Sequence, residues 1–172
     1  MPLYEFEGKK PKIAKDSYIH PQATIIGSVT IGSKCFIGPG AVLRADFGEI
    51  EVGDGTCIQD NCVVHADKKV VIGHNIIIGH GAIIHDVVLK SGVVVVMGAV
   101  VMNGAVAEED VIIGAGTVVK EDFKIAKGKI VVGNSARIVK DLDEEGKQRI
   151  LQGQQYYQSL PERYRKGLRI VG

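Results

Sequence analysis

One feature constrains the fold of this chain more than any other: apolar residues recur at about every sixth position along most of its length. The series comprises Ile13, Ile19, Ile25, Ile31, Ile37, Leu43, Val52, Ile58, Val64, Ile72, Ile78, Ile84, Leu89, Val95, Val101, Ala107, Ile113, Val119, Ile125 and Val131. A six-residue period is too short for a helix and its connecting turn, but it suits a short strand followed by a corner. The repeat therefore predicts a solenoid in which three strands make one coil.

A second inward position accompanies each large apolar residue, and it is mostly occupied by small side chains. These residues are Val29, Cys35, Ala41, Thr56, Cys62, Ile76, Ala82, Val88, Val93, Ala99, Ala105, Val111 and Thr117. One large and one small side chain per strand suit the narrow interior of a prism. We therefore expect Cys35 and Cys62 to be packed core thiols, because free cysteine behaves as a small hydrophobe.

Composition narrows the class of protein further. The 172 residues carry a formal net charge of +1, which argues against a nucleic-acid surface. No apolar stretch reaches the roughly 20 residues that a membrane span needs, and the N-terminus has no apolar leader. Three cysteines are too few for a disulfide framework. We expect a cytoplasmic protein that contacts neither nucleic acid nor membrane.

The repeat resembles that of left-handed parallel β-helices built from hexapeptides, and the hand is taken from this resemblance. Such a solenoid would span residues 1–140 in about six to seven coils, each burying its core against its neighbours. Residues 141–172 change period and predict a C-terminal α-helix. Its apolar residues would be Leu142, Ile150, Leu151, Tyr157 and Leu160, and Pro161 should end or kink it. This helix would lie along the prism or on a neighbouring subunit.

Three slips in the phase of the repeat decide how polar residues stack from coil to coil. They fall between Leu43 and Val52, between Val64 and Ile72, and between Ile84 and Leu89. Counting three faces per coil places Arg44, His65 and His85 in one column. The same count puts Asp60 over His80, with Gln59 beside them.

These stacks predict a metal site formed by His65, His80 and His85. One strand spacing separates His65 from His85, whereas His80 lies about 16 Å from His85 along an extended chain. One chain cannot bring the three together unless a corner folds sharply. A neighbouring subunit that supplies His80 would complete three identical sites in a homotrimer. Three histidines with an open position is the pattern of catalytic zinc, which generates hydroxide near neutral pH.

Simpler explanations of the same residues remain open at this point. The three histidines would then be exposed turn residues, as we expect His20 and His74 to be. Arg44 and Asp46 would be a surface ion pair, or would hold a trimer together with Asp60 through bidentate contacts. Gln59 would be a solvated amide, or would orient the oxygen of a zinc-bound hydroxide.

The segments "VLRADFGEIEVGDGTCIQDNCVVHAD", "IGHGAIIHD" and "VMGAVVMNGAVAEEDVIIGAGTVV" resemble the gamma-class carbonic anhydrase family over nearly the whole chain. The resemblance implies reversible hydration of CO2 to bicarbonate. It implies His65, His80 and His85 as ligands of zinc, iron(II) or cobalt(II), with His80 from the adjacent subunit. It further implies that Gln59 orients the hydroxide and that Arg44, Asp46 and Asp60 act at the interface.

The chain departs from the family pattern at three places. The long acidic loop that carries a glutamate proton shuttle is reduced to "ADKKVV", in which Asp67 is the only acid. Asp86 stands where glycine usually follows the last ligand, and Ser135 replaces a proline. A tyrosine of the C-terminal helix approaches the site in some relatives, and Tyr156, Tyr157 and Tyr164 are the candidates.

Three other functions compete with CO2 hydration. A hexapeptide acyltransferase uses a histidine as general base between subunits and needs no metal. A metal-assisted acyl-CoA thioesterase is a related alternative. A non-catalytic, metal-binding trimeric scaffold is the third, and the shortened loop favours it, whereas the presence of Gln59 argues against it.

Overall fold

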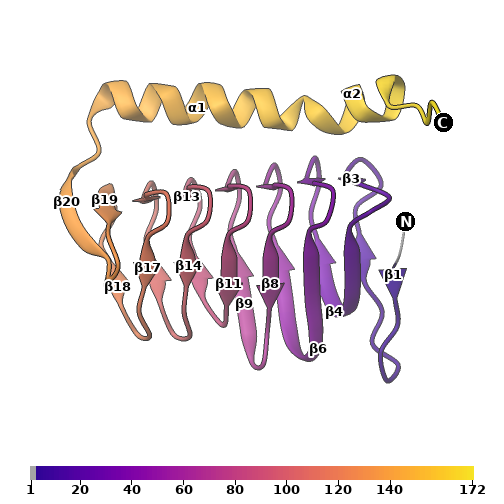
Figure 1. Cartoon of the computed structure of the whole chain (residues 1–172), viewed down its shortest axis with the longest axis horizontal. Coiled ribbons are helices and arrows are strands. Elements are labelled where there is room, and N and C mark those ends of the chain that lie inside the picture. The colour runs from indigo at the N-terminus through magenta and orange to yellow at the C-terminus, as the bar shows by residue number, and fades with distance from the viewer. Residues whose placement is uncertain (1–2) are drawn as a thin grey trace.

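The computed structural model describes residues 3–172, which form a prism of short strands with a helical rod along one side (Figure 1). The chain winds as a left-handed parallel β-helix of about seven coils. The predicted fold class is therefore confirmed, including its hand. Successive coils stack in chain order, so parallel strands pair between residues that are one coil apart in sequence.

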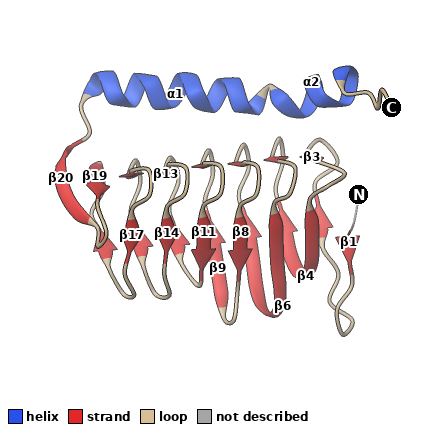
Figure 2. Ribbon diagram, viewed as in Figure 1, coloured by secondary structure: helices blue, strands red, loops and turns tan. Residues whose placement is uncertain are grey.

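Most strands contain two residues, and two are much longer (Figure 2). They are β1 (Leu3–Tyr4), β2 (Lys12–Ile13), β3 (Tyr18–Ile19), β4 (Thr24–Ile31), β5 (Phe36–Ile37), β6 (Val42–Val52), β7 (Cys57–Ile58), β8 (Val63–His65), β9 (Lys69–Ile72), β10 (Ile77–Ile78), β11 (Ile83–His85), β12 (Val88–Leu89), β13 (Val94–Val95), β14 (Val100–Val101), β15 (Val106–Ala107), β16 (Ile112–Ile113), β17 (Val118–Val119), β18 (Lys124–Ile125), β19 (Lys129–Val132) and β20 (Arg137–Asp141).

The strands build three faces. One face is an eight-stranded sheet in the order β20-β19-β16-β13-β10-β7-β5-β3. The other two faces form a single twelve-stranded sheet, because β4 and β6 run through the corner between them. In β6 this continuous stretch coincides with the first phase slip, since the extra residues extend the strand around the corner.

Most of the inward positions that the repeat predicts lie in the core, and Ala45, Ile50, Ala66 and Val70 at the phase slips complete it. Ile25, Leu43, Val64 and Ile84 are completely buried. Cys35 and Cys62 are also completely buried, and their thiols lie 3.2 Å from the Gly53 carbonyl and 3.1 Å from the Gly79 carbonyl. The prediction of packed core thiols is thus confirmed.

One inward position was predicted wrongly. Val87 is 1% exposed, whereas Val88, which the count selected, is only partly buried and begins β12. The slip between Ile84 and Leu89 removes one residue and so moves the small inward position to Val87.

The C-terminal segment forms two consecutive helices, α1 (Glu144–Gln158) and α2 (Leu160–Gly167). Asp143 caps α1 by accepting a 2.8 Å hydrogen bond from the Gly146 backbone. Pro161 stands in the first turn of α2, so the expected interruption at this proline is present. The boundary expected at residue 140 falls inside β20, which ends at Asp141.

The helices run back along their own prism rather than extending away from it (Figure 1). They cover an outward column of the eight-stranded sheet formed by Phe36, Cys57, Ile77, Val94, Ile112 and Ile130, which are paired from strand to strand. Gly153 of α1 faces Ile77, and a Cβ at this position would make an ordinary van der Waals contact with the Ile77 Cδ1 at 3.5 Å. Leu151, expected on the apolar side, is instead 48% exposed.

Polar contacts also fix the helices on the prism. Gln154 is buried and donates a 2.6 Å hydrogen bond to the Asn75 carbonyl, and Arg165 donates to the Ser17 carbonyl at 2.8 Å. No helix within residues 3–172 is long and apolar enough to cross a membrane.

Candidate metal centre

Parallel pairing brings three predicted site residues into one column. Arg44 of β6 pairs with His65 of β8, and His65 pairs with His85 of β11. The Nδ1 atom of His65 lies 2.9 Å from the Nε2 atom of His85, and the ring centroids are 4.8 Å apart. The face count therefore predicted this column correctly, because each coil returns the chain to the same face one strand spacing away.

Asp46 fixes the orientation of the first histidine. Its Oδ1 atom lies 3.2 Å from His65 Nε2, and its Oδ2 atom lies 2.5 Å from Arg44 Nη1. Desolvation raises the pKa of the Asp46 carboxyl, but hydrogen bonds from Arg44 and His65 outweigh this effect and hold the pKa below its usual value. The charged carboxylate favours a proton on His65 Nε2 and leaves Nδ1 facing His85.

A second carboxylate faces the two rings from the short segment after β8. Asp67 Oδ1 lies 3.7 Å from His65 Nε2, and Asp67 Oδ2 lies 3.9 Å from His85 Nε2. Within residues 3–172, His65, Asp67 and His85 are the one group of three whose ligand atoms all lie within 4.8 Å of one another. The sequence analysis had noted Asp67 only as the remaining acid of a shortened loop.

Asp86 holds that segment in place from the turn after β11. Its φ angle is +48°, so a residue with a side chain does occupy a left-handed conformation beside the histidines. The Oδ1 atom accepts hydrogen bonds from the backbone of Lys68 at 2.9 Å and Lys69 at 3.1 Å. Aspartate is thereby used where the family pattern has glycine, because its carboxylate ties the loop that carries Asp67.

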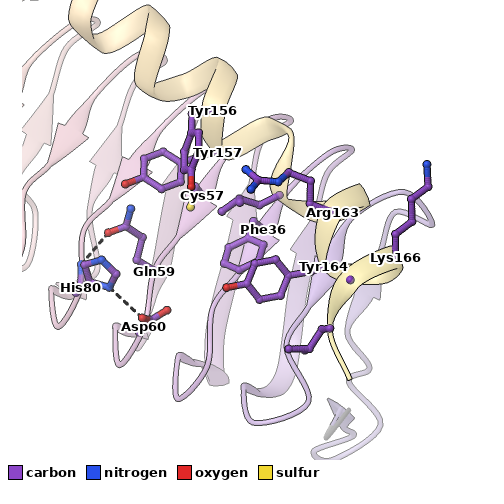
Figure 3. A pocket seen from close by; sticks show the side chains of 13 residues that line it. Phe36, Cys57, Gln59, Asp60, His80, Tyr156, Tyr157, Arg163, Tyr164 and Lys166 are labelled. Carbon is purple, nitrogen blue, oxygen red and sulfur yellow. Dashed lines mark hydrogen bonds and ion pairs between the residues drawn. The ribbon is translucent and has the colours of Figure 1, made fainter. Parts of the chain in front are cut away.

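The third histidine lies at a different corner. His80 Nδ1 is 3.2 Å from Asp60 Oδ2, and the His80 backbone donates a 3.2 Å hydrogen bond to Gln59 Oε1 (Figure 3). The predicted stacking of Asp60 on His80 is therefore correct. The His80 side chain is 53% exposed and belongs to no group of three potential ligands among the described residues.

The other polar residues that the sequence analysis singled out differ in their exposure and contacts. Gln59 is 5% exposed, so it is not a solvated amide. Arg44 and Asp46 do form an ion pair, and it lies within one chain. His74 is exposed and accepts a hydrogen bond from the Asp54 backbone at 3.0 Å, as expected for a turn residue. His20 contacts the rings of Tyr18 and Tyr164.

The residues of the histidine column fit a metal ion. Two nitrogens bound to one tetrahedral zinc at about 2.0–2.1 Å stand roughly 3.3 Å apart, close to the separation of His65 Nδ1 and His85 Nε2. A carboxylate on the far nitrogen of a ligating histidine is the usual supporting contact, and Asp46 makes it. His85 Nδ1 is buried without a hydrogen-bond partner. One chain therefore brings together two histidine ligands, with Asp67 as a third potential ligand beside them.

An open cleft of about 880 Å³ lies beside His80 and Gln59, under the C-terminal helices. Tyr156, Tyr157 and Tyr164 all line it, so the structure brings all three candidate tyrosines near these residues (Figure 3). The sequence analysis missed Arg163 and Phe36, which also line the cleft. No motif marked them, because their proximity depends on where the helices dock.

The coil geometry and inward repeat place the chain in the class of hexapeptide-repeat proteins. Residues 10–45 match the family model described as bacterial transferase hexapeptide, six repeats. The chain is 38% identical over 170 residues to the carnitine operon protein CaiE of Proteus sp. (strain LE138), covering 98% of this chain and 86% of that protein. It is 38% identical over 147 residues to the CaiE protein of Escherichia coli (strain K12 / DH10B), covering 84% of this chain and 75% of that protein.

A solved structure shares the fold over nearly its full length. It is a hexapeptide transferase family protein from Anaplasma phagocytophilum, with a TM-score of 0.92 and 36% identity, covering 95% of this chain and 98% of that one. Together with the CaiE relatives, it extends the similarity well beyond the residues matched by the family model. The chain belongs to the gamma-class carbonic anhydrase-like family that includes CaiE.

Proposed function

We propose that this chain is a metal-dependent, carbonic anhydrase-like lyase that hydrates CO2 reversibly to bicarbonate. The observation that carries the proposal is the close approach of His65 Nδ1 to His85 Nε2, with Asp46 supporting the first ring. Zinc is the proposed metal, with iron(II) or cobalt(II) as substitutes. Three cysteines, all free and buried, are compatible with the cytoplasm as the proposed location.

The proposed assembly is a homotrimer in which His80 of the neighbouring subunit completes each site. His80 is half-exposed in its own chain and is available to a neighbour. Val63 of β8 and Ile83 of β11 are 39% and 43% exposed on the strands that carry His65 and His85. Adjacent exposed apolar side chains commonly mark an interface between subunits.

When bound, the metal would supply a hydroxide-like nucleophile at neutral pH and stabilise developing negative charge. His65, His85 and the neighbour's His80 would hold it. Asp46 keeps the His65 ring in the ligating orientation, and Arg44 keeps Asp46 charged. The Gln59 carbonyl oxygen is occupied by the His80 backbone, so its amide N–H groups remain available to orient the attacking oxygen.

Proton release is the step for which this chain has the fewest suitable side chains. The shortened loop provides Asp67, whose side chain is 53% exposed and faces both histidines. In the proposed function Asp67 passes protons to buffer molecules. The long acidic loop of the family, which would assist this transfer, is absent. We therefore expect slow hydration that increases with buffer concentration.

The decisive test combines metal content with oligomer mass for the wild type and His80→Ala. We expect about one metal per chain in a trimer, and loss of metal in the variant while the trimer persists. CO2 hydration is then measured by stopped flow with and without an imidazole buffer. A wild-type trimer that takes up no zinc, iron or cobalt would overturn the proposal.

A second candidate is an acyl-group transferase or acyl-CoA thioesterase. The open cleft beside His80 favours it, since CO2 needs no such space, and the similar Anaplasma phagocytophilum protein is named a hexapeptide transferase family protein. Acyl transfer to a thiol probe, or thioester cleavage, without CO2 hydration would identify this function. A metal-loaded trimer without any of these activities would instead indicate a scaffold.

A further inference from the structure

The cleft under the C-terminal helices has the size and lining of a small-molecule site. Its volume of about 880 Å³ falls within the range of roughly 300–1,000 Å³ that ligand pockets occupy. Cys57 of β7 forms part of its wall, while α1 and α2 contribute residues on the other side. Because hydrogen bonds from Gln154 and Arg165 dock both helices on the prism, the cleft is a formed feature of one chain.

Aromatic rings form the middle of the cleft. Phe36 and Tyr164 meet edge to face with centroids 4.9 Å apart, and Tyr156 and Tyr157 meet in the same way at 5.5 Å. Tyr164 also packs on Tyr18, at 5.4 Å, so its ring is held from two sides. Rings held in place attract other aromatic groups and lose little side-chain entropy when a ligand stacks on them.

The polar groups separate into two ends of the cleft (Figure 3). Gln59, Asp60 and His80 lie at one end, where Asp60 is paired with His80. Arg163 lies towards the other end, with its guanidinium carbon 5.4 Å from the centre of the Tyr156 ring.

Arg163 is the cation that is free to take a ligand. Its guanidinium has no carboxylate within ion-pair distance among residues 3–172, whereas nearby Lys166 is paired with Glu162. An arginine held against an aromatic ring presents a planar set of donors that matches a carboxylate. The ring of Tyr156 would thus hold Arg163 ready for an anionic group.

We propose that this cleft binds a small aromatic carboxylate, with its ring among Tyr156, Tyr157 and Tyr164 and its carboxylate on Arg163. The groups that would bind this ligand belong to α1 and α2 and are not metal ligands, whereas His80 at the other end of the cleft is a ligand in the proposed trimer. It goes beyond the proposed hydration of CO2, because that substrate has no aromatic body and carries no charge. The ligand is an effector or a second substrate that reaches the protein beside His80.

Titration calorimetry with benzoate and the uncharged benzamide tests this proposal on the full-length protein, before and after treatment with a chelator. We expect benzoate to bind about tenfold or more tightly than benzamide in both preparations. Arg163→Gln should remove this difference and leave the thermal unfolding curve unchanged. Arg149→Gln is the matched control, since Arg149 lies on α1 outside the cleft and pairs with Glu145.

Three results would overturn the proposal. The first is a lack of saturable benzoate binding, and the second is equal binding of benzoate and benzamide to the wild type. The third is benzoate binding that disappears with the chelator and is unaffected by Arg163→Gln. That third result would assign benzoate to the metal and support the metal site while removing the cleft as a binding site.

Discussion

His65 and His85 occupy paired positions on adjacent parallel strands, and His65 Nδ1 lies 2.9 Å from His85 Nε2. The approach follows from the coil itself, since each turn of the solenoid brings the chain back by one strand spacing. Asp46 then selects the nitrogen that faces the partner ring. A pair of histidines with the spacing of two ligands of one metal ion is consequently built into a single chain.

Replacing Asp46 should weaken metal binding without removing it. Asp46→Asn keeps the shape of the side chain but loses the charge that holds the His65 ring, so we expect metal affinity to fall about 10- to 100-fold. Competition with a coloured chelator measures this change. Asp54→Asn is the control, because Asp54 lies beside His74 at another corner, and unchanged affinity in Asp46→Asn would contradict the assigned role.

Mixing two inactive variants should restore metal sites. His80→Ala and His65→Ala each remove one ligand from every site of the proposed trimer. In a cyclic trimer that contains both variants, one interface joins an intact His80 to an intact His65 and His85 pair, so we expect about one native site per mixed trimer. Metal content after unfolding and refolding of the mixture measures it. A mixture that stays metal-free would indicate that the histidines of one site come from one chain.

A charge at Ile83, which pairs with the exposed Val63, should dissociate the proposed trimer. Ile83 is 43% exposed beside His85, and Ile83→Lys would place an ammonium group in the proposed interface. We expect a folded monomer with a normal β-sheet spectrum, measured by light scattering and circular dichroism. Val132→Lys is the control, because Val132 is similarly exposed, at 40%, on β19 of another face. A trimer that survives Ile83→Lys would place the interface elsewhere.

Asp86 should contribute to stability through the loop that it ties. Asp86→Ala loses two hydrogen bonds to backbone N–H groups and puts alanine at a φ of +48°, so we expect a loss of about 1–3 kcal/mol in the free energy of unfolding. Asp86→Asn keeps an acceptor and tolerates this φ, and it should cost less. Denaturant titration of both variants decides the order, and equal stability of Asp86→Ala and the wild type would refute the account.

Buried thiols should make the fold sensitive to alkaline pH. Burial raises the pKa of Cys35 and of Cys62 to about 11, above the value of about 9 expected in the unfolded chain. Their contribution to stability is thus complete below pH 9 and is lost as the pH rises towards 11. Each thiol should contribute a slope of about 1.4 kcal/mol per pH unit in that window.

The double variant Cys35→Ala and Cys62→Ala isolates this effect from other groups that titrate in the same range. We expect the wild type to lose stability faster than the double variant between pH 9 and 11. Urea unfolding at several pH values gives both curves. Parallel curves would show that the two thiolates do not govern alkaline unfolding.

The sequence by itself determined the coil, its core and the stacking of distant polar residues. These features follow from a local period, because a residue's place in its hexad decides whether it points inward and the number of coils decides what lies above it. Arg44, His65 and His85 could therefore be aligned from the printed sequence, as could Asp60 and His80. The departure from glycine at Asp86 was also visible in the sequence, though its positive φ and its bonds to the loop could not be read from the repeat.

Only the tertiary structure decided where the helices lie and what they enclose. Gln154 and Asn75 are 79 residues apart, and no period connects them. Their contact depends on the docking of α1 over the outward column, which brings Arg163 and three tyrosines to the cleft beside His80. A repeat specifies contacts between equivalent positions of neighbouring coils, whereas a segment outside the repeat finds its place through the shape and polarity of the surface it covers.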